Sequence, residues 1–110
     1  MTSFKEILAE LPSVEGIHSI ELYLQNAEEP YAEIPNADGK RGSLMVYNQL
    51  IEEFGSVLNK ECAERGLELF AEHTKDARQN PGAHPNIDRL FEIIEQNRQD
   101  LMVTVVHEDE

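Results

Sequence analysis

The architecture of this chain is set by residues 59–97, which read NKECAERGLELFAEHTKDARQNPGAHPNIDRLFEIIEQN. In the first half, small and apolar side chains recur at steps of three and four residues, and charged ones fall on the opposite face. The recurring side is formed by Ala63, Gly66, Leu67, Phe70, Thr74 and Ala77. This pattern predicts one amphipathic helix that begins after an Asn59 cap, runs to Gln79 and ends at Pro81 and Gly82.

A second helix is predicted after the loop from Asn80 to His84. Pro85 suits the first helical position, and Asp88 lies in the first turn, where the helix dipole favours an anion. Helices joined by so short a loop pack antiparallel, with their apolar stripes facing each other. The stripe of the second helix is formed by Ile87, Leu90, Phe91 and Ile94. We expect the main core to contain Leu67, Phe70, Leu90, Phe91 and Ile94.

The N-terminal region predicts a short helix. Ser3 and Glu6 form a capping-box pattern, in which each side chain can satisfy the other residue's backbone amide. Pro12 then ends the helix. Its apolar stripe is formed by Phe4, Ile7, Leu8 and Leu11.

From Ile17 the alternation of apolar and polar residues has a period of two, which predicts a strand. The inward face would carry His18, Ile20, Leu22 and Leu24, and the outward face Ser19, Glu21, Tyr23 and Gln25. A shorter strand from Tyr31 to Ile34 has Ala32 and Ile34 inward. A turn from Asn26 to Pro30 would join the two strands as a hairpin.

The remaining elements complete an α+β fold. Residues 36–43 form a loop, and Ser43 can cap a helix that ends at Gly55. The apolar, β-branched run from Leu101 to Val106 predicts a third strand, which a solvated tail follows. In the helix after Ser43, one face is shared by Leu44, Tyr47, Leu50, Ile51 and Phe54. The predicted order is α-β-β-α-α-α-β, a single domain over residues 1–110.

The predicted sheet is small, three-stranded and mainly antiparallel, and it packs against the helices. We expect its first strand to lie in the centre, between the second and the third. An alternative places the third strand beside the second, and connection rules allow both orders.

The composition is strongly acidic. There are 22 acidic and 9 basic residues, and the formal net charge is −13. That charge repels nucleic-acid phosphates and anionic lipids, so we expect neither nucleic acid nor membrane as a partner. A basic protein is the natural partner, although solubility alone also explains an acidic surface.

The same composition favours a cytoplasmic protein. Cys62 is the lone cysteine and cannot form an internal disulfide. No apolar run has the length of a membrane span, and the N-terminus lacks the apolar core of a signal peptide.

One loop concentrates positive charge at the expected start of a helix. Lys40 and Arg41 lie between two glycines, and free amides at a helix start favour an anion. The candidate anion-binding residues are Lys40, Arg41, Gly42 and Ser43, to which His84 or Arg89 would contribute. The spacing does not match a P-loop, in which the Lys follows the second Gly, and a plain solvated connection is the simpler explanation.

No catalytic residue, metal site or cofactor is predicted. Cys62 and His73 lie three helical turns apart, about 16 Å, which is too far to share one metal. His73 and His84 flank a loop and would converge with Asp76 or Asp88 in some arrangements, but no spacing here is diagnostic of metal ligands. Cys62 has no identifiable base, and a free cysteine is usually an inert apolar residue.

The outer face of the hairpin is a possible partner surface. It would carry Glu21, Tyr23, Tyr31 and Glu33, which suit a basic protein. The competing interpretation is a plain solvated sheet face, or one that the first helix covers.

The strand at 101–106 would take an edge of a three-stranded sheet. Leu101, Val103 and Val105 face one side, Met102 and Val106 face the other, and no proline or charge protects the edge. Either the first helix covers Met102 and Val106, or two chains pair through this strand as a homodimer. The charge of −13 favours the monomer.

Four runs resemble the short bacterial proteins grouped as the family of unknown function numbered 2322. They are residues 33–36 (EIPN), 40–44 (KRGSL), 66–74 (GLELFAEHT) and 80–90 (NPGAHPNIDRL). The resemblance covers nearly the whole chain and implies a small bacterial cytosolic α+β domain, but it supplies no activity, cofactor or catalytic residue.

Two interpretations of function remain. The first is a non-enzymatic interaction module that uses its acidic surface, because charge is the most pronounced property and no set of acid, base and nucleophile is visible. The alternative is a small-anion or phosphoryl-ligand binding protein that uses the 39–43 loop.

Overall fold

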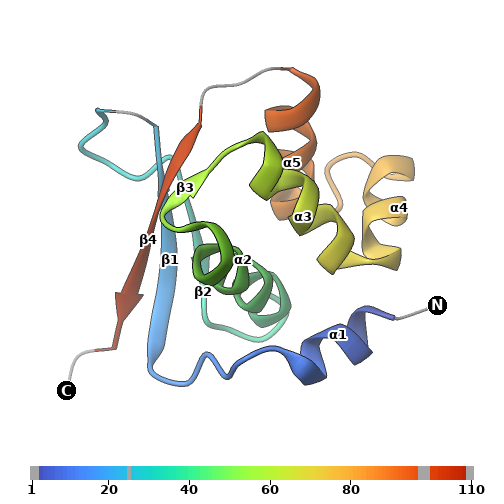
Figure 1. Cartoon of the computed structure of the whole chain (residues 1–110), viewed down its shortest axis with the longest axis horizontal. Helices are drawn as coiled ribbons and strands as arrows, with labels where there is room; N and C mark the ends of the chain where they lie inside the picture. Colours follow the sequence, from blue (N-terminus) through green and yellow to red (C-terminus); the bar gives the residue numbers. More distant parts are fainter. Residues whose placement is uncertain (1–2, 25, 97–99, 109–110) are drawn as a thin grey trace.

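The computed structural model describes residues 3–24, 26–96 and 100–108, which form an α+β fold with helices on one side of a sheet (Figure 1). The helices are α1 (Phe4–Glu10), α2 (Arg41–Phe54), α3 (Lys60–Phe70), α4 (Glu72–Gln79) and α5 (Pro85–Glu95). The strands are β1 (Ile17–Tyr23), β2 (Ala32–Pro35), β3 (Val57–Leu58) and β4 (Leu101–His107). None of the described helices combines the length and apolar character of a membrane span.

The predicted fold class is confirmed, but the predicted element order and strand number are wrong. The sheet has four strands in the order β2-β1-β4-β3, and every neighbouring pair is antiparallel. β1 lies between β2 and β4, as expected. The last strand does not take the edge, because β3 pairs with it through Val57 opposite Met102 and Leu58 opposite Leu101. Two residues are too few to show a period, so the sequence pattern carried no sign of β3.

A β-bulge changes which residues of β1 point inward. The register between β1 and β4 shifts between Ile17 and Ser19, so that Ile17 and Ile20 are both buried although they are three residues apart. Ile20 and Leu22 point into the core, as predicted. The prediction for His18 is wrong, because the bulge leaves its side chain exposed.

The helix predicted from Asn59 to Gln79 is broken at Ala71, whose backbone has φ 51° and ψ −122°. Asn59 does cap α3, accepting from the amide of Cys62 at 2.9 Å. Thr74 stabilises the break, since its Oγ1 donates to the carbonyl of Leu67 at 2.6 Å and its amide donates to the carbonyl of Ala71 at 3.1 Å. α4 therefore forms a separate helix.

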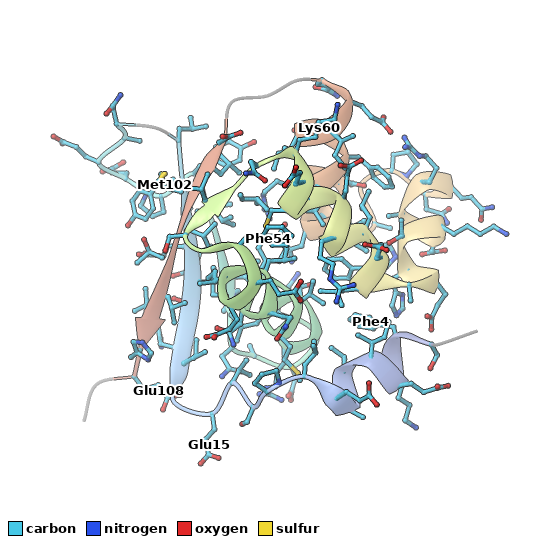
Figure 2. The ribbon with its side chains drawn as sticks, viewed as in Figure 1. Phe4, Glu15, Phe54, Lys60, Met102 and Glu108 are labelled. Carbon is cyan, nitrogen blue, oxygen red and sulfur yellow. The ribbon has the colours of Figure 1, made fainter. Side chains whose placement is uncertain are left out.

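α1 packs against α2 and α3, on the helical side of the sheet. Ser3 caps it by accepting from the amide of Glu6 at 3.2 Å, and the Glu72 carboxylate accepts from the amide of Phe4 at 2.7 Å. The expectation that α1 covers Met102 and Val106 is therefore wrong. Met102 lies on the side of the sheet away from the helices and is 38% exposed (Figure 2).

In the core, α3 packs closely against α5 and α2 at Gly66. A Cβ atom at this glycine would lie 2.7 Å from Cδ1 of Leu90 and 3.1 Å from Cδ1 of Leu50. Of the predicted core residues, Phe70 and Leu90 are buried, as is Ile87 of the same helical stripe. The other three, Leu67, Phe91 and Ile94, are partly buried and pack against the core.

Gly66→Ala is expected to lower the free energy of unfolding by about 1–3 kcal/mol, the usual cost of overpacking a core. Leu90 is fully buried and cannot swing away without displacing its neighbours. Urea unfolding measures the change. Glu64→Ala, on the exposed face of α3, is the control and should change it by less than about 0.5 kcal/mol. A Gly66→Ala chain as stable as the parent would contradict the close approach of these helices.

Candidate functional site

A cavity of about 390 Å³ opens between α1, the 39–43 loop and the start of α5. Phe4, Leu8 and Phe70 form its apolar wall. Its polar lining includes Lys40, Arg41, Gly42, Ser43, His73 and His84. The structure thus brings the predicted anion-binding loop together with two histidines that lie far away in the sequence.

The start of α2 forms one side of the cavity. The helix begins at Arg41 with Lys40 in the capping position, so Ser43, predicted as the cap, is instead the third helical residue. The amides of Lys40 and Arg41 both donate to the carbonyl of Ala37 at 2.9 Å. The amides of Gly42 and Ser43 have no partner within the described chain. Two free N–H groups therefore lie at the positive end of the helix dipole.

The two basic residues of the loop have different roles. Arg41 donates through Nε to Oδ1 of Asn36 at 2.8 Å and through Nη1 to Oδ1 of Asp38 at 3.3 Å. These bonds join the first residue of α2 to the loop that precedes it. Lys40 is exposed and makes no ion pair with any described residue, so its ammonium group is available to a ligand.

His73 and His84 converge on the other side of the cavity, with ring centroids 5.7 Å apart. The rings of Phe4 and His73 pack nearly perpendicular to each other, with centroids 4.8 Å apart. Nε2 of His84 lies 2.6 Å from Oδ2 of Asp76, and this hydrogen bond lowers the pKa of the Asp76 carboxyl group. The sequence left open whether these histidines meet, because their contact depends on the unpredicted break at Ala71.

The histidine pair does not form a metal centre with a third ligand. Asp88, one of the two acidic residues considered for that role, accepts instead from the amide of Gly82 at 2.9 Å. Among the described residues, no group of three or more His, Cys, Asp or Glu side chains is placed to hold a metal ion.

Arg89 is not part of the cavity, contrary to one of the expectations. Its Nη1 donates to the Tyr47 hydroxyl at 3.1 Å and to Oδ1 of Asn86 at 3.0 Å. The Tyr47 hydroxyl donates in turn to the Asn86 carbonyl at 2.6 Å, and burial raises the pKa of Tyr47. Arg89 therefore joins α5 to α2.

Cys62 is buried in α3 and does not line the cavity. Burial raises the pKa of its thiol to about 11, so the thiol remains protonated near neutral pH. A buried, protonated thiol is a poor nucleophile.

Three of the four residues expected on the outer sheet face lie there together. Glu21 is directly opposite Glu33, and the Tyr23 hydroxyl donates to Oε1 of Glu21 at 3.0 Å, which raises the pKa of Tyr23. Tyr31 does not join them. It precedes β2 and lines a separate hollow with Arg89 and other residues of α5.

Comparison with known proteins connects the chain to one family. Residues 4–104 match a family model described as uncharacterized protein conserved in bacteria (DUF2322). No curated protein and no solved structure matches the chain. The match extends from α1 into β4 and so includes both sides of the cavity.

Asp76→Ala should destabilise the fold in a pH-dependent manner. The pKa of Asp76 is lower in the folded chain than in the unfolded chain, where it is about 3.9. The stabilisation is therefore fully present above the unfolded value and is lost as the pH falls through the folded value. We expect parent and variant to differ in unfolding free energy near neutral pH and to converge in acid, as measured by urea unfolding at a series of pH values.

The control is again Glu64→Ala, which removes an exposed carboxylate without a partner among the described residues. It should leave the unfolding free energy nearly unchanged at every pH. A deficit in Asp76→Ala that persists unchanged into acid would indicate a packing effect rather than the His84 hydrogen bond.

Proposed function

The chain belongs to the bacterial family of uncharacterized proteins DUF2322, and we propose that it binds a small anionic ligand, such as a phosphoryl compound, in the cavity between the 39–43 loop and the two histidines. The family description carries no activity. The proposal is therefore supported by the residues of this chain alone.

The observation that carries the proposal is the absence of acidic side chains from the cavity lining. The sequence has 22 acidic residues and a net charge of −13. Yet the described residues that line this cavity include Lys40, Arg41 and two histidines, and no Asp or Glu. Because like charges repel, an anion meets less repulsion here than at a surface dense in carboxylates.

The parts of the cavity suit different parts of such a ligand. The free amides of Gly42 and Ser43 and the positive end of α2 can bind anionic oxygens, as helix starts do in phosphate-binding proteins. Lys40 adds a positive charge, and an N–H group of His73 can donate from the other side, where Nε2 of His84 is bonded to Asp76. The wall of Phe4, Leu8 and Phe70 would contact an apolar portion of the ligand.

Titration of the ¹⁵N-labelled chain with inorganic phosphate should shift the amide resonances of Gly42 and Ser43. Lys40→Gln should weaken the binding about two- to fivefold, which corresponds to the ~0.3–1 kcal/mol of a charge interaction near a helix end. Arg41 is a poorer choice for substitution, because its loss would also disturb the loop.

The control is Lys60→Gln, which makes the same change of charge at the opposite end of α3 from Phe4 (Figure 2). It should leave the phosphate affinity unchanged. Equal weakening by both variants, or shifts spread evenly over the surface, would show a general effect of charge and would exclude a site in the cavity.

A second candidate function is the binding of a basic protein on the outer face of the sheet. Like charges directly opposite each other on neighbouring strands are destabilising, and Glu21 faces Glu33 in this way. The helices lie on the other side of the sheet (Figure 1). Glu33 is exposed and Glu21 is half-buried. A basic partner would offset the repulsion between them.

Glu33→Gln should raise the stability of the isolated chain by about 0.2–1 kcal/mol and weaken its capture of basic proteins from the native cell extract. Pull-downs at low and high salt, together with urea unfolding, measure the two effects. Glu10→Gln, at an exposed position of α1, is the control and should do neither. If the parent captures no partner in a salt-sensitive manner, this candidate fails.

A further inference from the structure

The second half of β4 has a free edge. β3 pairs only with Leu101 and Met102, and the amide of Val103 donates to the carbonyl of Ser56 at 2.8 Å. Within residues 3–24, 26–96 and 100–108, no strand continues beyond this point. Backbone groups alternate in direction along an antiparallel strand, so the N–H and C=O of Val105 point the same way as the Val103 amide. They therefore face an unpaired edge.

A groove of about 380 Å³ lies between the end of β4, α2 and residues 12–17, and Val105 is one of its lining residues. Ile17, Ile51 and Val105 form its apolar wall. Glu15 and Glu52 also line it, and neither makes an ion pair with a described residue. Figure 2 shows Glu15 near Glu108, at the end of the sheet where β4 finishes.

Asn48 places a polar side chain with unused hydrogen-bonding groups in the groove. Its side chain lines the groove and is only 9% exposed, yet its amide has no hydrogen-bond partner among the described residues. The Asn48 amide atoms are not fully enclosed, so they are open to the groove and available to a bound chain that supplies a carbonyl or an N–H group.

We propose that the free edge of β4 binds an extended segment of a basic protein, which adds to the sheet beside Val105. The Val105 backbone groups would continue the ladder, and the amide of Asn48 would bond a polar group of the segment. Basic side chains of the segment would meet Glu15 and Glu52. A second copy of this chain fits less well, because it carries the same carboxylates and a charge of −13. The groove is separate from the anion cavity and from the Glu21–Glu33 face.

The test uses a synthetic peptide of alternating lysine and valine, with a glutamate–valine peptide and a proline-interrupted basic peptide for comparison. Titrated into the ¹⁵N-labelled full chain, the lysine–valine peptide should slow amide exchange at Val105 and shift the side-chain amide signals of Asn48. The other two peptides should do neither, because one has the wrong charge and the other cannot form a strand.

Val105→Pro should lower the affinity of the chain for the lysine–valine peptide at least about tenfold. Proline removes the Val105 N–H group, which faces the free edge and makes no bond to β1. The double variant Glu15→Gln, Glu52→Gln should lower the affinity for the same peptide and reduce the salt dependence of binding. This variant tests the site even if Val105→Pro fails to fold. The matched control is Glu10→Gln with Glu64→Gln, which should bind as the parent does.

Three outcomes would overturn the proposal. A folded Val105→Pro chain with unchanged affinity would exclude the free edge, and equal binding of the proline-interrupted peptide would show attraction by charge without strand addition. If sedimentation shows a dimer of the parent that Val105→Pro abolishes, the occupant is a second copy of this chain rather than a basic partner.

Discussion

The break at Ala71 is the constraint on which the candidate site depends. Its backbone lies in a positive-φ region that residues with a side chain rarely adopt, at a cost of about 1–3 kcal/mol. The two hydrogen bonds of Thr74 and the bond from the Phe4 amide to Glu72 offset this cost. The break sets the direction of α4, which carries His73 into contact with Phe4 and His84 at one side of the cavity.

Most of the regular structure could be predicted because its causes are local. Capping residues, prolines and apolar periods indicated the helices, the hairpin and the last strand, since each of these signals lies within a few residues of the element it specifies. The features that the sequence did not reveal depend on distant neighbours. β3 exists because its two residues meet β4, the bulge at His18 follows from pairing with the same strand, and the break at Ala71 contains neither glycine nor proline.

The features of the candidate site also separate into those with local causes and those that depend on distant residues. The 39–43 loop could be identified in advance, because free amides and the helix dipole are properties of a helix start. The different roles of Lys40 and Arg41 could not, since they depend on where Asn36 and Asp38 lie. His73 and His84 join the loop only through tertiary structure. The lack of carboxylates in the cavity is likewise a property of the folded surface, and no count of residues reveals it.

The pairing of β1 with β4 has a consequence for how the chain folds. Ile17 lies opposite His107, so the two central strands of the sheet come from positions far apart in the sequence. During synthesis, β1 can pair with β2 early but must wait for almost the whole described chain before its other edge is covered. Contacts between such distant segments slow folding and leave strand edges open to aggregation in the meantime. We therefore expect loop closure between β1 and β4, rather than the formation of the helices, to limit the rate at which this protein reaches its native state.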